Sequence, residues 1–228
     1  MNGESKGNIL VFCAHSDDQV LGAGGAMARY ARNGYDVYTF IFSYGEGSHP
    51  HVQLKHIATT RVKESQEADS IIGGKGVFFF GAKDGNIKGD FEKRKRMKNL
   101  KDVLMKYKPV KVFTHSVDDM LPDHRGVRQL VLKAYDDLNK KEGFKCDVYT
   151  FDVWNLWNVR KREKPVLVVD ITGYFKYKVK ALHSFKSQIS FFSHTFLVNF
   201  LYVGSYIKAV FNGLKHGYRF AEVFYKVR

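Results

Sequence analysis

Short apolar runs alternate with longer amphipathic stretches along most of this chain. The apolar runs are rich in Val, Ile, Phe and Tyr, as in buried strands, and the stretches between them repeat apolar residues at helical spacing. The pattern predicts strands at 8–13, 37–43, 76–81, 110–116, 147–153, 166–172 and 221–227. It predicts helices at 20–33, 52–72, 91–107 and 124–141, and a mainly helical portion from about residue 173.

This alternation predicts an α/β fold, a Rossmann-like, mostly parallel sheet with helices on both faces. We expect a single domain over residues 1–228, because the chain contains no proline-rich linker, repeat or low-complexity segment. In parallel sheets, ligands bind beyond the carboxyl ends of the strands. The polar segments that follow the first four strands should therefore converge, namely residues 15–18, 44–46, 83–85 and 115–124.

The two cysteines and the N-terminus bear on the compartment. Cys13 and Cys146 lie in or beside apolar runs, which favours buried free thiols over a disulfide. The opening MNGESKGN is too short and polar for a secretory signal. Together these features lead us to expect a cytoplasmic protein.

Two features of the sequence are compatible with an anionic partner or a membrane surface. The net charge is +14, with basic runs at 92–111 and 159–164; an outward helix face explains the first run, because the apolar positions of 91–107 recur at helical spacing. The aromatic stretch 189–207 is about long enough to span a bilayer, but polar residues interrupt it. We therefore expect a buried or interface helix there, with peripheral membrane contact as the alternative.

The richest motif is AHSDDQVLGAGG, residues 14–25, directly after the first strand. A dinucleotide site would need G-x-G-x-x-G at the turn, and two adjacent carboxylates would repel a pyrophosphate. A metal site is the better interpretation. His15 and Asp18 offer an imidazole and a carboxylate for Zn²⁺, and His115 or His124 could be the third protein ligand that catalytic zinc requires.

The motif resembles the AHPDDExxGxGG signature of the LmbE-like, or PIG-L-like, zinc-dependent N-deacetylases. Further family motifs match in the same order: R-x-x-E at 61–64, Asp-Gly at 84–85 and, in part, H-P-D-H at 121–124. Later segments of this family, a K-x-x-A-L…S-Q helix and an AE-x-F element, match 178–188 and 221–224. The resemblance therefore spans nearly the whole chain.

The resemblance implies a metal-dependent hydrolase. By position, His15, Asp18 and His124 would bind one Zn²⁺ per chain, with another divalent metal as the alternative, and Asp17 would be the general base that acts on a zinc-activated water. The reaction would remove an N-acetyl group from an N-acetylglucosamine-type conjugate and release acetate and a free amine. We expect a homo-oligomer that acts on a small molecule rather than on nucleic acid.

Three further residues match family positions, each with a structural alternative. Arg61 and Asp84 fall where the family contacts its substrate, although Arg61 could instead pair with Glu64 and Asp84 could simply form the Asp-Gly turn. Asp123 would orient a ligand histidine, or would only shape a turn. These alternatives stay open at the level of sequence.

The sequence also departs from the family pattern. Ser16 replaces the usual Pro, and Gln19 replaces the usual Glu. Leu121 replaces the first His of H-P-D-H, which in the family acts on the substrate carbonyl; His115 could substitute, or be an ordinary strand-end histidine. The gap at Leu121, with the high charge, motivates an alternative function: a non-catalytic zinc-containing protein that binds an anionic glycan or nucleic acid.

Overall fold

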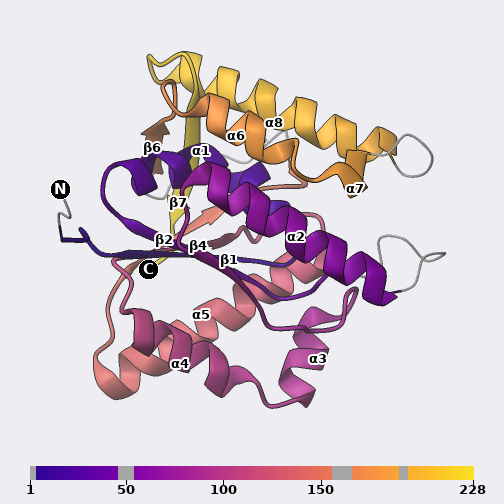
Figure 1. Cartoon of the computed structure of the whole chain (residues 1–228). Helices are drawn as coiled ribbons and strands as arrows, with labels where there is room; N and C mark the ends of the chain where they lie inside the picture. The colour runs from indigo at the N-terminus through magenta and orange to yellow at the C-terminus, as the bar shows by residue number, and fades with distance from the viewer. Residues whose placement is uncertain (1–3, 46–53, 156–165, 190–194) are drawn as a thin grey trace.

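The computed structural model describes residues 4–45, 54–155, 166–189 and 195–228. Their strands form a seven-stranded sheet in the order β3-β2-β1-β4-β5-β7-β6, parallel throughout except for β7, which is antiparallel to both neighbours (Figure 1). The strands are β1 (Asn8–Cys13), β2 (Asp36–Ile41), β3 (Gly76–Phe79), β4 (Lys111–His115), β5 (Asp147–Phe151), β6 (Val166–Asp170) and β7 (Ala221–Lys226).

Helices cover both faces of this sheet, and each face has its own apolar core. On one side lie α1 (Asp18–Arg32), α2 (Leu54–Ile72), α6 (Phe175–Leu182), α7 (Lys186–Ile189) and α8 (Thr195–Lys215), and on the other α3 (Ile87–Lys93), α4 (Met97–Tyr107) and α5 (Pro122–Glu142) (Figure 1). The predicted fold class is confirmed. Both cysteines are free, Cys13 buried and Cys146 half-buried.

The single helix expected over 91–107 is wrong. The structure has two helices there, α3 and α4, separated by a turn in which Lys95 takes a left-handed φ of 52°. Between Phe91 and Met97 the sequence has only charged residues, so no apolar side chain holds a continuous helix against the core. The Arg96 guanidinium donates a hydrogen bond to the Phe80 carbonyl and anchors the turn.

The stretch 189–207 is helical where the structure describes it, because α8 begins at Thr195; residues 190–194 lie outside the described part. Within the described chain, no helix has both the length and the apolar character that crossing a bilayer requires. One side of α8 buries Leu201 and Ala209, whereas Val203 and Phe211 are largely exposed. The helix is therefore buried on one face only.

The glycines of the AHSDDQVLGAGG motif allow close packing of α1. A Cβ atom at Gly22 would lie 2.1 Å from the Phe151 ring, and one at Gly25 would lie 2.6 Å from Ile171. Because real Cβ atoms do not approach so closely, these positions let α1 lie directly against the end of β5 and the residue that follows β6. Their role here is packing rather than contact with a phosphate.

A buried ion pair also bonds to the backbone of α1. The Lys178 ammonium lies 2.6 Å from the Glu222 carboxylate and also donates to the Leu21 carbonyl at 2.8 Å. The same carboxylate accepts the backbone N–H groups of Gly25 and Ala26, at 3.1 and 2.7 Å. Residues from α6 and β7 thus satisfy backbone groups in the middle of the first helix.

Asp69, near the end of α2, should make stability depend on pH. The side chain is buried, and burial raises its pKa from 3.8 to about 6. Between those two values the folded chain holds a proton that the unfolded chain has released, so stability falls as pH rises from about 4 to 6 and stays lower above that.

We expect Asp69→Asn, which has no carboxylate to ionise, to raise the free energy of unfolding at pH 7.5 by about 1–3 kcal/mol. Urea unfolding at pH 4 and pH 7.5 measures this, and the two proteins should differ less at the lower pH. A gain of equal size at both pH values would contradict the assignment to Asp69 ionisation.

Candidate metal centre

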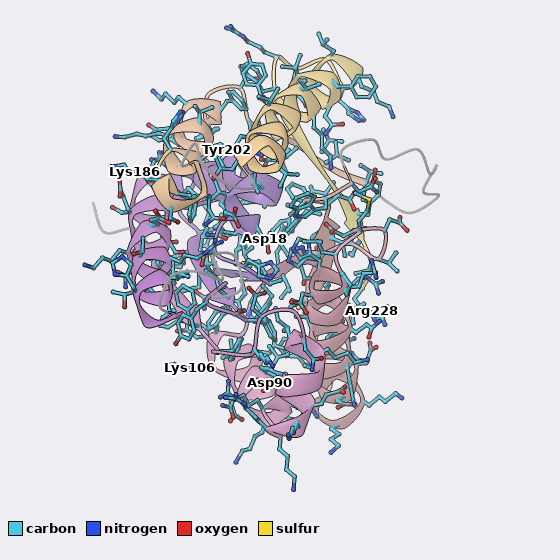
Figure 2. The ribbon with its side chains drawn as sticks, turned by 90° about the vertical axis from the view of Figure 1, so that its right-hand side faces the viewer. Asp18, Asp90, Lys106, Lys186, Tyr202 and Arg228 are labelled. Atoms are coloured by element: carbon cyan, nitrogen blue, oxygen red, sulfur yellow. The ribbon has the colours of Figure 1, made fainter. Side chains whose placement is uncertain are left out.

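The candidate site lies at the point where the strand order changes direction. From β1 the chain runs outward to β2 and β3, and then returns to β4 on the other side of β1. The turns after β1 and β4 therefore meet at one edge of the sheet, where α1 begins with Asp18 and α5 begins with Pro122. Figure 2 shows Asp18 deep in the middle of the molecule.

Three side chains that the sequence predicted as ligands come together here. His15 Nδ1 lies 3.4 Å from His124 Nε2, and Asp18 Oδ2 lies 3.5 and 3.3 Å from those two nitrogens. Asp18 and His124 are buried, and His15 is half-buried. The backbone N–H of His15 donates to Asp18 Oδ2 at 2.7 Å, which holds the carboxylate in this position.

The outer ring nitrogens of both histidines face carboxylates. His15 Nε2 lies 3.0 Å from Asp84 Oδ1, and His124 Nδ1 lies 2.9 Å from Asp119 Oδ1. A neutral imidazole that donates on that side has its lone pair on the other side. When each imidazole donates its outer N–H to the carboxylate, its inner nitrogen and the Asp18 oxygen converge on one point, where a bound cation would replace the proton that the raised histidine pKa otherwise retains.

The three donor atoms fit a tetrahedral ion. Zn²⁺ binds nitrogen and oxygen at about 2.0–2.1 Å, so two ligands at tetrahedral positions lie about 3.3–3.4 Å apart. The three separations between the His15, Asp18 and His124 atoms run from 3.3 to 3.5 Å. Three protein ligands at this spacing match a catalytic type of zinc site, which leaves the fourth position open.

Two other clusters of potential ligands are less suitable. One joins His115, Asp119 and His124, and the other joins His15, Asp84 and Asp123. In the first, His115 Nε2 already accepts the backbone N–H of Ala14 at 3.0 Å. In the second, both carboxylates accept backbone N–H groups from the loop at 85–87. In the first-described trio both imidazoles keep their inner nitrogens for a common ligand, although Asp18 Oδ2 also accepts the His15 backbone N–H.

The local charges act strongly on one another. Burial would lower the pKa of His124, but Asp18 and Asp119 outweigh it and raise that pKa to about 9. Burial would raise the pKa of Asp18, yet His124 and its neighbours hold it well below the usual value. The site is therefore built to keep Asp18 ionised.

Asp17 faces a different environment from Asp18. Burial raises the pKa of Asp17, although Arg61 opposes this with its guanidinium Nη2 3.4 Å from Asp17 Oδ1. Arg61 does not pair with Glu64, which instead accepts the backbone N–H and hydroxyl of Ser187, both at 2.7 Å. The turn thus directs the Asp18 carboxylate toward the two histidines and the Asp17 carboxylate toward Arg61.

Asp84 and Asp123 both lie on the outer side of His15. Asp84 Oδ1 accepts from the Gly85 backbone N–H at 3.0 Å as well as facing His15 Nε2, so the turn geometry and the histidine contact occur together. Asp123 accepts the N–H groups of Gly85 and Ile87, and its Oδ2 lies 3.7 Å from His15 Nε2. That Asp84 contacts substrate stays a prediction.

His115 does not take the place of the missing family histidine. It is fully buried, its ring stacks on that of His124 with centroids 3.9 Å apart, and its Nε2 accepts the Ala14 N–H. Burial and the neighbouring His124 lower its pKa to about 4. His115 therefore packs against the ring of His124. Leu121, which precedes α5, contributes only an apolar side chain.

Gln19 performs a task that a glutamate could not. Its amide nitrogen donates to the Ser16 carbonyl at 2.9 Å inside the turn, and its carbonyl oxygen lies 3.6 Å from the Cys13 thiol. A carboxylate has no N–H to give, so the amide suits a turn that lacks the proline of the family signature.

Two residues of the site were not predicted from the sequence. Asp119 accepts the backbone N–H groups of Val153 and Trp154 at 2.9 and 3.1 Å as well as facing His124. In the sequence, the only indication of this role is that Asp119 lies in the same loop as the predicted ligand His124. Tyr202 of α8 is near enough to Asp17 and Arg61 for both to act on its pKa, which burial raises; nothing in the sequence pointed to it.

Asp119→Asn should weaken metal binding about 10–100-fold, because the asparagine amide no longer fixes the His124 tautomer with a full charge. Competition with a fluorescent zinc chelator measures the change. The matched control is Asp118→Asn, which removes the neighbouring carboxylate and should leave affinity within about twofold. Equal losses in the two variants would mean that Asp119 has no special part in positioning His124.

Comparison with known proteins places this geometry in a family. The family model for PIG-L, GlcNAc-PI de-N-acetylase, matches residues 10–135. A curated relative, 4-oxalmesaconate hydratase from Pseudomonas putida, is 32% identical over 125 residues, which cover 52% of this chain. The match spans 47% of that relative, about half of its length.

Solved structures share the fold over nearly the whole chain. GalB, the 4-carboxy-2-hydroxymuconate hydratase from Pseudomonas putida, has a TM-score of 0.80 at 23% identity and covers 97% of this chain and 96% of its own. N,N'-diacetylchitobiose deacetylase from Pyrococcus horikoshii has a TM-score of 0.77 at 23% identity, covering 96% and 83%. With the family match over more than half of the sequence, the chain belongs to the PIG-L, or LmbE-like, family of metal-dependent enzymes.

Proposed function

We propose that this protein is a zinc-dependent hydrolase that removes the N-acetyl group from an N-acetylglucosamine-type compound. The observation that supports it is the triangle of His15, Asp18 and His124 donor atoms, with the separate carboxylate of Asp17 beside it in the chain. Zinc in such a site lowers the pKa of water to about 7 and polarises a carbonyl group.

Asp17 is the group that would move the proton. Its carboxylate would take a proton from the water that attacks the acetamide carbon, and would give it to the amine nitrogen as the C–N bond breaks. The products are acetate and a free amine. Burial raises the pKa of Asp17, which brings it nearer to the working pH and makes it a stronger base than an exposed carboxylate.

Arg61 would hold the substrate and Asp17 together. Its guanidinium is buried, contacts Asp17, and its Nε has no hydrogen-bond partner among the described residues. That leaves a donor for a sugar hydroxyl or an anionic group of the substrate. Asp84 would keep His15 oriented and could extend to a substrate hydroxyl from the same loop.

The test is acetate release from a panel of N-acetylated aminosugars, with metal content measured on the same samples. Free N-acetylglucosamine, N,N'-diacetylchitobiose and a glycolipid conjugate differ in the size of the group attached to the N-acetylglucosamine unit. We expect equal amounts of acetate and amine from at least one of them, abolished by a chelator and restored by zinc. Bound zinc without acetate from any member would contradict the proposal.

A second candidate reaction is the addition of water to an unsaturated tricarboxylate. Two relatives carry the name hydratase. In this chain Leu121 offers no donor to an amide carbonyl, whereas Arg61 offers a buried guanidinium that suits a carboxylate. Loss of conjugated-diene absorbance without acetate formation would favour hydration, and acetate release would favour deacetylation.

A further inference from the structure

The outer face of α8 is apolar where an ordinary surface helix is polar. Six of the eleven large hydrophobic residues exposed in the described chain gather there and in the turn that follows. We call them the α8 stripe: Val203, Tyr206, Ile207, Phe211, Leu214 and Tyr218. The first five recur at helical spacing on one side, and Phe211 and Leu214 are 66% and 73% exposed. A contiguous exposed patch of this kind marks an interaction surface.

The segment that carries the α8 stripe contains no acidic residue. From Ile171 to Ala221 the sequence has neither Asp nor Glu. Two of its lysines turn inward, Lys178 to Glu222 and Lys208 to Asp152. The remaining basic residues of the segment are exposed and form no ion pair with a described residue. We call them the basic flank: Lys176, Lys180, Lys186, Lys215 and Arg219.

We propose that the α8 stripe and its basic flank dock on the surface of an anionic lipid bilayer. An amphipathic helix lies in the interface with its apolar side chains about 5–10 Å deep and its basic residues at the lipid headgroups. The two tyrosines of the stripe suit the boundary between hydrocarbon and water. No described helix can cross the bilayer, which agrees with a helix that lies on it.

Charge favours a bilayer over a second copy of the chain. Association of two copies through the α8 stripe would bring the same basic flank from each copy together, without a carboxylate in the segment to compensate. Anionic headgroups supply the missing negative charge.

The α8 stripe also borders an apolar hollow. A groove of about 300 Å³ lies between α6 and α8, lined by Phe175, Leu182 and Tyr202 together with two stripe residues, Val203 and Tyr206. Docking through the stripe would therefore place lipid at this groove.

Vesicle flotation of the whole chain tests the proposal. We expect binding to phosphatidylcholine vesicles that contain about 30% phosphatidylserine, weaker binding at high salt and little binding to phosphatidylcholine alone. Phe211→Ser with Leu214→Ser should lower the partition coefficient at least about tenfold, and so should Lys215→Glu with Arg219→Glu.

The matched control is Lys93→Glu with Lys98→Glu. These exposed lysines, in α3 and α4, lie on the opposite side of the sheet, and their reversal changes the net charge equally (Figure 1). We expect vesicle binding within about twofold of wild type for this pair. As a second measurement that leaves the stripe apolar, Phe211→Trp should show a blue-shifted emission on anionic vesicles and quenching by brominated lipid.

Three outcomes would overturn the proposal. The first is no flotation of the wild-type chain on anionic vesicles at low salt. The second is an equal loss from the control pair, which would indicate attraction by net charge alone. The third is a wild-type dimer that Phe211→Ser with Leu214→Ser dissociates while vesicle binding is unchanged. Because none of these residues belongs to the metal centre, the result is independent of the proposed hydrolysis.

Discussion

Asp17→Asn is expected to release acetate about 10²–10⁴ times more slowly than the wild-type chain, with its metal content unchanged. The asparagine amide has the shape of the carboxylate but cannot accept the proton of the attacking water. Asp17 contributes no atom to the triangle formed by His15, Asp18 and His124, so the metal should remain. Acetate assays and elemental analysis on one preparation measure both quantities.

Asp69→Asn is the matched control, because it removes another buried carboxylate that lies away from the metal centre. We expect its rate of acetate release to equal that of wild type. A small effect of Asp17→Asn, within about threefold, would exclude Asp17 as the general base. Loss of the metal in Asp17→Asn would show instead that this carboxylate belongs to the metal site.

The second large effect concerns the neighbouring residue. Asp18→Asn should lower zinc affinity by more than about 100-fold and abolish activity, because it removes the only negative charge of the ligand set. The side chain keeps its size, and the asparagine carbonyl oxygen can still accept the His15 backbone N–H, so the turn should fold. Zinc retention after dialysis against a weak chelator distinguishes the two proteins.

The pair of variants separates the roles of two adjacent carboxylates. Asp17→Asn is expected to keep zinc and lose turnover, whereas Asp18→Asn is expected to lose both. Stoichiometric zinc in Asp18→Asn after dialysis would mean that the Asp18 carboxylate is not required to complete the site.

The mostly parallel sheet and the convergence of polar turns could be predicted because both follow from local patterns, whereas the strand order was not predicted. The strand–helix alternation requires parallel neighbours, and parallel strands direct the turns after β1 and β4 to one edge. His15, Asp18 and His124 therefore meet where the sequence placed them. Periodicity alone could not show that the helix over 91–107 is broken. The apolar residues on the two sides of the break keep roughly helical spacing in the sequence, and the left-handed conformation of Lys95 is visible only in the structure.

Partners within the site were harder to predict than its location. Asp118, Asp119 and Asp123 look alike in the sequence, and only the path of the chain at Val153 and Trp154 gives Asp119 its backbone donors. Arg61 has a carboxylate three residues along the same helix, yet its partner is Asp17, 44 positions away. Such choices depend on tertiary packing, which local sequence does not encode.

The ion pair between Lys178 and Glu222 has a consequence for how the protein is made. The backbone N–H of Gly25 donates to Glu222, which lies 197 positions later in the chain. At ribosomal rates of about 5–20 residues per second, that acceptor is synthesised roughly 10–40 s after Gly25. During this interval the backbone N–H groups of Gly25 and Ala26 lack their contact with Glu222. The packing of α1 against β7 can therefore be completed only late in synthesis, when Glu222 and β7 have been made.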